Sequence, residues 1–374
     1  MITPRQTADI LIAAGGTGGH VFPAVAVASR LVSMGLPVHW IGTSRGLERK
    51  VAASANLPLR EIDFEGVRGK GLMGWLRLPL RLLRAAWQVF QILRRVRPRL
   101  VMVFGGYVSF PVGLVARLMG LPLMVLEQNA VMGSANRWLA RLADVVVTSF
   151  PDTRHAPSHS RCLGNPVREE LVRQGPRTRA IAERRGAIRI LVLGGSLGAA
   201  PLNQGCPRIF ADCRDGGSLF EVIHQTGQQG LEPTRQLYQA LGLVAEVVPF
   251  IDDMAGAYDW ADLLICRAGA STVAELMAVA IPAIFVPLPH AIDDHQTANA
   301  AAMTGQGTAW LVAQGPDFQS RVTQILMGLR REDLVDRSQR LADAKAGHAL
   351  TAVIDMVQRV LNKPMAPNSP GAGA

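Results

Sequence analysis

The chain has 374 residues, enough for two domains of about 150 residues each, and its 49% hydrophobic and 18% charged residues exclude extensive disorder. Its four cysteines include no CxxC pair, which argues against a disulfide framework and against a zinc site. Residues 1–162 carry 20 Lys and Arg against 8 Asp and Glu, whereas the remainder carries 19 against 21, so the net charge of +10 comes from the first part alone. This excess favours an anionic partner, either nucleic acid or phospholipid headgroups, or an arginine-rich solvated surface.

Short apolar segments with strand character alternate with segments of helical length, in two series. The predicted strands of the first series are residues 10–14, 38–42, 100–104, 123–126 and 145–149. Those of the second series are residues 188–193, 220–225, 246–250, 263–266 and 283–287. This alternation predicts an α/β fold of two doubly wound, Rossmann-like domains that meet near residues 160–170. Helical spacing continues over residues 317–362, and the tail 363–374, rich in Pro, Gly, Ala and Ser, is expected to be disordered.

No segment predicts a membrane-spanning helix or an export signal. The longest apolar stretch, residues 101–126, contains Arg117 and two prolines, which interrupt it before it reaches the roughly 20 residues that a bilayer span needs. The first 14 residues lead directly into a glycine-rich turn and contain no small-residue cleavage site. We therefore expect neither feature.

Each series opens with a strand, a glycine-rich turn and a helix. The turns read Gly-Gly-Thr-Gly-Gly-His at residues 15–20 and Gly-Gly-Ser-Leu-Gly-Ala at residues 194–199. Such a turn lets backbone N–H groups and the helix dipole approach a phosphate, because no Cβ blocks the way. Neither turn is a strict GxGxxG, and no Walker A sequence is present, so ordinary dinucleotide or P-loop binding is not favoured. The alternative is a tight strand-to-helix turn without a ligand.

His20 follows the first glycine turn and precedes Pro23 by three residues, which predicts a place in the first turn of a helix. A helix amino terminus disfavours the imidazolium ion, so the ring would be neutral and able to accept a proton. That is the state that a general base needs. On position alone, a capping or packing histidine is an equally good interpretation.

A third glycine-bearing turn, residues 266–272, precedes a helix predicted over residues 273–279 and presents N–H groups and hydroxyls to an anion. Glu275 lies one helical turn after Ser271 and could accept hydrogen bonds from a ribose, although a solvated helix carboxylate is the simpler interpretation. The acidic pairs Asp252-Asp253 and Asp293-Asp294 have no obvious third ligand, so they give little support to a metal site.

Residues 68–99 combine nine basic residues with apolar side chains and contain no acid. A membrane-interface contact is predicted for a set of apolar and basic residues in this strip: Leu72, Trp75, Leu76, Arg77, Leu80, Arg81 and Arg84. The alternative is an amphipathic helix with its apolar side in the core and its arginines solvated. Nucleic acid is less favoured, because no nucleic-acid module and few aromatic residues for base stacking are present.

Several motifs spread in order over residues 15–299 resemble one family of enzymes. They are Gly15-Gly16-Thr17-Gly18-Gly19-His20 with Pro23, Phe104-Gly105-Gly106-Tyr107-Val108-Ser109, Glu127-Gln128-Asn129, Gly164-Asn165-Pro166-Val167-Arg168, Gly194-Gly195-Ser196-Leu197-Gly198-Ala199, Asn203, Phe250-Ile251-Asp252-Asp253-Met254, Arg267-Ala268-Gly269-Ala270-Ser271-Thr272, Glu275 and Asp294-His295-Gln296. The chain is similar to the bacterial glycosyltransferases that add GlcNAc to lipid I and so form lipid II for peptidoglycan.

The resemblance implies two Rossmann-like domains facing a cleft, the GT-B arrangement. Residues 1–162 would bind lipid I and the membrane, residues 163–345 would bind UDP-GlcNAc, and a C-terminal helix at 346–362 would pack back on the first domain. The family's donor site carries over to Thr17, Gly18, Gly19, Asn129, Arg168, Ser196, Ile251, Ala270, Ser271, Thr272, Glu275 and Gln296. In this scheme the backbone of Ile251 contacts the uracil, Glu275 binds the ribose hydroxyls and Gln296 binds the GlcNAc hydroxyls.

The sequence departs from the family pattern at Leu126, where many relatives have a histidine, so no catalytic role transfers to that position. His20 becomes the expected base, with Glu127 or Tyr107 as possible assistants. The expected reaction is an inverting transfer to the 4-hydroxyl of MurNAc, without a metal or other cofactor. The expected location is the cytoplasmic face of the cell membrane, with anionic phospholipids as partners. The alternatives are a UDP-GlcNAc 2-epimerase on the same scaffold and a non-catalytic module that binds nucleotide sugar and lipid.

Overall fold

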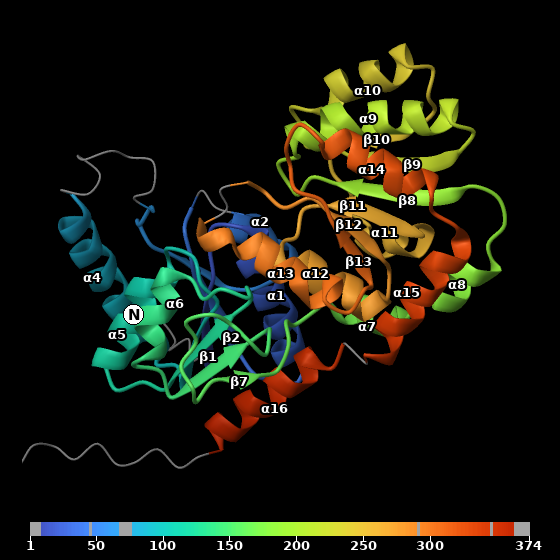
Figure 1. Ribbon diagram of the computed structural model, residues 1–374. Helices are drawn as coiled ribbons and strands as arrows, with labels where there is room; N and C mark the ends of the chain where they lie inside the picture. Colours follow the sequence, from blue (N-terminus) through green and yellow to red (C-terminus); the bar gives the residue numbers. More distant parts are fainter. Residues whose placement is uncertain (1–8, 45–46, 67–76, 290–291, 345–346, 363–374) are drawn as a thin grey trace, which may run out of the picture.

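The computed structural model describes residues 9–44, 47–66, 77–289, 292–344 and 347–362, and it has two lobes, each built around a parallel sheet (Figure 1). The first sheet has seven strands in the order β3-β2-β1-β4-β5-β6-β7. Its strands are β1 (Ile10–Ala13), β2 (Val38–Gly42), β3 (Leu59–Glu61), β4 (Leu100–Val103), β5 (Leu123–Glu127), β6 (Val145–Thr148) and β7 (Arg161–Cys162). The helices of this lobe are α1 (Gly18–Ser33), α2 (Leu47–Ser54), α4 (Leu78–Val96), α5 (Ser109–Leu118) and α6 (Ser134–Ala140).

The second sheet has six strands in the order β10-β9-β8-β11-β12-β13. Its strands are β8 (Ile188–Leu193), β9 (Phe220–Gln225), β10 (Glu246–Val248), β11 (Leu263–Cys266), β12 (Ala283–Phe285) and β13 (Ala309–Leu311). The helices of this part of the chain are α7 (Glu169–Gln174), α8 (Thr178–Glu183), α9 (Ala200–Asp215), α10 (Leu231–Ala240), α11 (Met254–Trp260), α12 (Ala270–Val279), α13 (His295–Thr304), α14 (Phe318–Met327), α15 (Arg331–Asp343) and a 3-10 turn, η1 (Ile292–Asp294).

The central strands β1, β4 and β11 are buried on both faces, which explains why they are apolar throughout rather than alternating. In β1, Ile10 and Ile12 pack into one core with α1, whereas Leu11 and Ala13 pack into a second core with α4 and α5. Successive side chains of a strand point to opposite faces, so one four-residue strand contributes to two cores.

A C-terminal helix, α16 (Ala349–Leu361), crosses from the second lobe and lies against the first (Figure 1). Its buried side chains, among them Leu350, Val353 and Val357, join the core that contains α1. Nη2 of Arg99 donates a hydrogen bond of 2.7 Å to the carbonyl of Leu361 at the end of this helix. The chain therefore passes twice between the two lobes.

The predicted fold class is confirmed, and the strand predictions for residues 188–193, 220–225 and 263–266 agree with the structure at both ends. The short strands β3, β7 and β13 are absent from the prediction, because they contribute two or three residues each and two of them have exposed or half-buried side chains. Among the described residues, no helix is both long and apolar enough to span a bilayer.

Candidate active site

The turns that follow β1 and β4 lie side by side, because these strands pair in parallel at the point where the strand order reverses. Ligands of open α/β sheets bind at the carboxyl ends of such strands. Gly105 and Gly106 have φ values of +96° and +79° and run along the first glycine turn. A Cβ on Gly106 would lie 2.1 Å from the carbonyl oxygen of Gly15, and one on Gly105 would lie 2.9 Å from Cδ2 of His20. Only glycine permits this close packing.

His20 lies in the first turn of α1, where the sequence predicts it. Its Nδ1 is 3.4 Å from Oγ1 of Thr17, and its ring packs against Gly105. Burial lowers the pKa of His20, with Glu127 acting in the opposite direction and His295 adding to the decrease. The ring is therefore neutral near pH 7 and can accept a proton.

Tyr107 covers the same glycine turn: its Cε1 is 3.7 Å from the position that a Cβ of Gly16 would occupy. The phenolic oxygen lies 3.3 Å from Oγ1 of Thr43, which follows β2. Burial raises the pKa of Tyr107, and nearby Glu48 adds to the increase. The phenol therefore remains protonated at neutral pH and offers a hydroxyl, not a phenolate, to the site.

Glu127 is buried, and both of its carboxylate oxygens are engaged. Oε1 accepts hydrogen bonds from the backbone and the side chain of Asn129, at 3.0 and 3.1 Å. Oε2 accepts from the backbone of Gly133 and from Nδ2 of Asn136, at 3.0 and 2.9 Å. Four donors on one carboxylate fix the loop of residues 127–136 and leave little of the carboxylate free for a substrate.

In the second lobe, the third glycine turn ends at the amino terminus of α12. The prediction that this helix begins at residue 273 is wrong, because Ala270, Ser271 and Thr272 already form its first turn. Their N–H groups belong to the first turn of a helix, where they have no intrahelical acceptor and favour a bound anion. Oγ of Ser271 lies 3.4 Å from the carbonyl of Gly19, so the amino ends of α12 and α1 meet across the two lobes.

Glu275 on α12 is nearly buried, which excludes the interpretation as a solvated helix carboxylate. Its Oε2 accepts a 2.8 Å hydrogen bond from the hydroxyl of Tyr258, and Oε1 lies 3.4 Å from Nη2 of Arg168. Burial raises the pKa of Glu275, while Arg168 opposes the increase. The structure thus brings together Arg168 and Glu275, two residues predicted for the nucleotide-sugar site. It adds Tyr258, which the sequence does not predict.

The second glycine turn leaves Ser196 exposed after β8. Gln225, the last residue of β9, links this turn to Ile251: its Nε2 donates to the carbonyl of Gly195 at 3.0 Å, and its Oε1 accepts from the backbone of Ile251 at 3.1 Å. The sequence does not predict Gln225, although its place at the end of a predicted strand is a usable signal. Gln296 lies at the start of α13, where its Oε1 accepts from the backbone of Leu288 at 2.9 Å.

A buried asparagine on α13, Asn299, ties the two lobes together at the site. Its Oδ1 accepts a 2.8 Å hydrogen bond from the backbone of Ala130, and its Nδ2 donates to Oδ1 of Asn129 and to the carbonyl of Ala268, at 3.2 and 3.1 Å. Asn129 is therefore held by Glu127 on one side and by Asn299 on the other. The sequence motifs do not point to Asn299, because its partners come from distant parts of the chain.

The described residues contain no group of three or more His, Cys, Asp and Glu side chains that could hold a metal ion. Asp293, one of the acidic residues considered for such a site, instead pairs with Arg137 of the other lobe at 2.8 Å.

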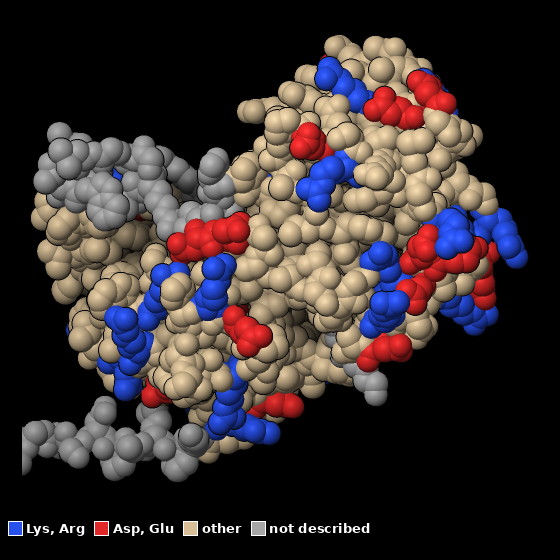
Figure 2. Space-filling model, in the orientation of Figure 1, with Lys and Arg blue, Asp and Glu red and all other residues tan. Residues whose placement is uncertain are grey.

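The strip of residues 68–99 is described only in part, and Leu72, Trp75 and Leu76 lie outside the described residues. From Leu78 to Val96 it forms α4, with Ala85, Val89, Leu93 and Val96 buried. On the other side of the helix, Leu80, Leu83 and Trp87 are exposed by 72, 68 and 61%, so the helix is not a purely core-packed element. Arg77 and Arg84 are also exposed, whereas Arg81 is half-buried. On the second lobe, near α8 and α15, acidic and basic side chains lie close together (Figure 2).

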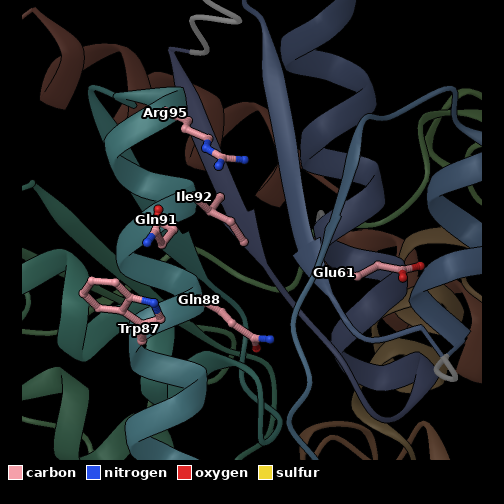
Figure 3. A pocket seen from close by; sticks show the side chains of 6 residues that line it. All are labelled: Glu61, Trp87, Gln88, Gln91, Ile92 and Arg95. Atoms are coloured by element: carbon pink, nitrogen blue, oxygen red, sulfur yellow. The ribbon is translucent and has the colours of Figure 1, made fainter.

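A groove of about 370 Å³ lies between α4 and β3, away from the glycine turns. Figure 3 shows Glu61 at the end of the edge strand β3 and the other lining residues along α4. The residues on α4 are Trp87, Gln88, Gln91, Ile92 and Arg95. None of these residues is a candidate for the catalytic or donor site. The groove therefore belongs to the outer face of the first lobe rather than to the cleft.

Two Rossmann-like domains whose glycine turns and helix amino ends face one cleft define the GT-B fold. The chain belongs to glycosyltransferase family 28: it matches the N-terminal domain of this family over residues 10–148 and the C-terminal domain over residues 189–355.

Relatives and a solved structure agree with this assignment. A UDP-N-acetylglucosamine--N-acetylmuramyl-(pentapeptide) pyrophosphoryl-undecaprenol N-acetylglucosamine transferase from Stutzerimonas stutzeri (strain A1501) is 50% identical over 86% of this chain and 90% of its own. The protein of the same name from Azotobacter vinelandii is 46% identical over 94% of this chain and 99% of its own. The crystal structure of Acinetobacter baumannii MurG is similar with a TM-score of 0.78 and 36% identity, over 94% of this chain and 99% of that one.

Proposed function

We propose that the protein transfers GlcNAc from UDP-GlcNAc to the 4-hydroxyl of MurNAc in lipid I, so that lipid II forms for peptidoglycan synthesis. The observation that carries this proposal is the contact between the two helix amino ends, Ser271 on α12 and Gly19 on α1, in a chain that belongs to family 28. A diphosphate bound beside α12 would lie next to the first glycine turn. Donor and acceptor would therefore meet at His20.

The donor half of the site is assigned to the second lobe. The N–H groups of Ala270, Ser271 and Thr272, with the turn around Ser196, would neutralise the diphosphate of UDP as its charge increases in the transition state. The Arg168, Tyr258 and Glu275 cluster fixes a carboxylate beside α12 that can accept hydrogen bonds from the ribose hydroxyls. The backbone at Ile251, held by Gln225, would contact the uracil, and Gln296 would contact the GlcNAc hydroxyls. The remaining donor contacts are assigned to Thr17, Gly18 and Gly19 of the first turn, and to Asn129.

The transfer itself is a displacement with inversion. His20 takes the proton from the 4-hydroxyl of MurNAc, and the oxygen forms a bond to the anomeric carbon of GlcNAc from the face opposite UDP. The bond from that carbon to the diphosphate oxygen breaks, and UDP leaves with the electron pair. The product linkage is β. The neutral His20 ring suits this step, because its pKa is lowered by burial.

We assign Glu127 a positioning role rather than the role of base. Its four hydrogen bonds hold Asn129, Gly133 and Asn136, so a protonated Glu127 would disrupt the loop that it organises. Its negative charge opposes the decrease in the pKa of His20 and would stabilise the imidazolium that forms during transfer.

We further propose that α4 holds the protein at the cytoplasmic face of the cell membrane, where lipid I would be presented. Leu80, Leu83 and Trp87 are exposed on one side of this helix, and arginines lie beside them. An amphipathic helix of this kind buries its apolar side chains at the headgroup boundary and places its arginines on anionic phospholipids.

The test of the transfer is UDP release by the purified protein from UDP-GlcNAc, with and without lipid I. We expect UDP release only when lipid I is present, together with a lipid product that has gained one GlcNAc. Release of UDP without the acceptor would contradict the proposal. Formation of UDP-ManNAc would contradict it in favour of an epimerase. Binding of UDP-GlcNAc without turnover would contradict it in favour of a binding module.

A further inference from the structure

We propose that Glu48 and Thr43 act as positioning residues that fix the direction of the Tyr107 hydroxyl, so that its oxygen accepts a hydrogen bond from the acceptor sugar. The inference deepens the proposed transfer reaction and rests on it. None of the sequence motifs contains Glu48 or Thr43, and neither belongs to the predicted donor site.

The geometry leaves one direction for the hydrogen bonds in this group. Both the backbone N–H and the hydroxyl of Thr43 donate to Oε1 of Glu48, at 3.0 and 2.8 Å. The hydroxyl of Thr43 has a single proton, which is already donated, so in its 3.3 Å contact with Tyr107 it must accept. The phenol therefore donates to Thr43, and the lone pairs of its oxygen remain for a partner in the cleft.

The group lies directly under the first glycine turn. A Cβ on Gly15 would lie 3.2 Å from Oε1 of Glu48, while Tyr107 contacts the other side of the turn at Gly16. Thr43, Gly15 and Tyr107 follow the carboxyl ends of β2, β1 and β4, three neighbouring strands. This is the edge at which His20 also lies, so the Tyr107 oxygen is placed for the acceptor half of the cleft.

Stability alone does not explain a carboxylate at this position. Glu48 is fully buried, and its Oε2 has no hydrogen-bond partner among the described residues. A buried oxygen without a donor destabilises the fold. Residues that destabilise a fold in this way are common at functional sites.

The test compares two substitutions of Thr43 that differ in one hydroxyl. Thr43→Val keeps the shape and the backbone donor but removes the acceptor of the phenol, whereas Thr43→Ser keeps the hydroxyl. We expect kcat/KM for lipid I to fall about tenfold in Thr43→Val and to stay within about twofold in Thr43→Ser, with the Kd for UDP unchanged in both. Thr308→Val, which removes the buried threonine hydroxyl that donates to Met303, is the control and is expected to keep full activity.

A double-mutant cycle separates orientation from general damage. If Thr43 acts only through Tyr107, Thr43→Val combined with Tyr107→Phe loses no more activity than Tyr107→Phe alone, and Glu48→Gln, which still offers Oε1 to Thr43, remains active. Additive losses, or equal activity of Thr43→Val and the wild-type protein, would overturn the inference. A wild-type protein without acceptor-dependent UDP release would instead reject the proposed function itself.

Discussion

His20 and Glu127 lie close enough to influence one another, yet their surroundings suit them to different tasks. The His20 ring is neutral and contacts the hydroxyl of Thr17 only at 3.4 Å, so it can exchange this contact for a substrate. Glu127 accepts four hydrogen bonds within its own loop, at 2.9 to 3.1 Å. A base must release its proton and return to its starting state in each cycle, which favours the less constrained group.

Replacement of His20 by alanine tests its role. We expect His20→Ala to lower kcat by a factor of about 10² to 10⁴, the usual contribution of a general base. The Kd for UDP should stay unchanged, because the contacts proposed for its uracil, ribose and diphosphate belong to the second lobe. Steady-state kinetics and calorimetric titration with UDP measure the two quantities. His159→Ala, at an exposed histidine far along the chain, is the control. A His20→Ala variant with near-normal kcat would reject the assignment.

The pH dependence of the reaction follows from the direction of the His20 pKa. Burial lowers this pKa from its usual 6.5. The ring is therefore still largely unprotonated at pH 6.5, and it becomes protonated, and lost as a base, only when the pH falls below its lowered pKa. The acid limb of kcat/KM should therefore have its midpoint below pH 6.5. A midpoint above 6.5 would contradict a His20 whose pKa is lowered, and NMR titration of the imidazole protons would identify the group.

At the scale of the elements, the sequence predicts best what is local. The largely apolar strands β8 and β11 and the glycine turns after β1 and β8 are visible because backbone conformation and burial are encoded in adjacent residues. The start of α12 is missed by three residues, because Gly269 and not the polar Ser271 or Thr272 takes the N-cap position. Short edge strands such as β3 and β7 depend on their neighbours in the sheet.

The partners in the site are harder to predict than its glycine turns. Tyr258 is 17 positions from Glu275, and Asn299 is 169 positions from Ala130. No local pattern links such pairs, because the fold alone brings them together. The resemblance to a family supplied the positions of single residues, whereas the hydrogen bonds that hold them come from the three-dimensional arrangement.

Membrane binding is a property of α4 that can be tested apart from catalysis. Leu80, Leu83 and Trp87 are exposed, so their combined replacement by serine should not unfold the lobe. Each apolar group withdrawn from the bilayer weakens binding, and we expect at least a tenfold loss of affinity for vesicles of phosphatidylglycerol and phosphatidylcholine in a sedimentation assay. The control replaces two exposed apolar residues of the second lobe, Leu219 and Val244, by serine. If both variants lose the same affinity for vesicles, or if the α4 variant loses none, the exposed apolar residues of α4 are ordinary surface residues.

At the scale of the whole molecule, several contacts join the lobes around the site. Among them are the hydrogen bonds of Asn299, the ion pair of Arg137 with Asp293, and the contact of Ser271 with Gly19. Of these, only Asn299 is fully buried and bonded to the loop that Glu127 organises. We therefore expect closure of the cleft and the arrangement of this loop to be coupled through Asn299.

Asn299→Ala tests this coupling. The substitution leaves the backbone donor of Ala130 without its acceptor, which costs about 1 to 3 kcal/mol if the site stays buried. We expect the lobes to separate more often and kcat to fall about tenfold, while the Kd for UDP changes less than about twofold. Gln339→Ala on the exposed side of α15 serves as the control. If kcat is unchanged in Asn299→Ala, the interdomain hydrogen bonds do not contribute to the catalytic arrangement.

The central claim is that GlcNAc passes directly between the two lobes, from UDP to the acceptor, with inversion. It is tested most directly by following UDP-GlcNAc labelled with ¹³C at the anomeric carbon, by NMR, in the presence of the protein and lipid I. The account predicts that the α signal of the donor is replaced by a β signal in the lipid product, with one UDP released for each sugar transferred. An α-linked product, free GlcNAc or a sugar altered at C2 would contradict it.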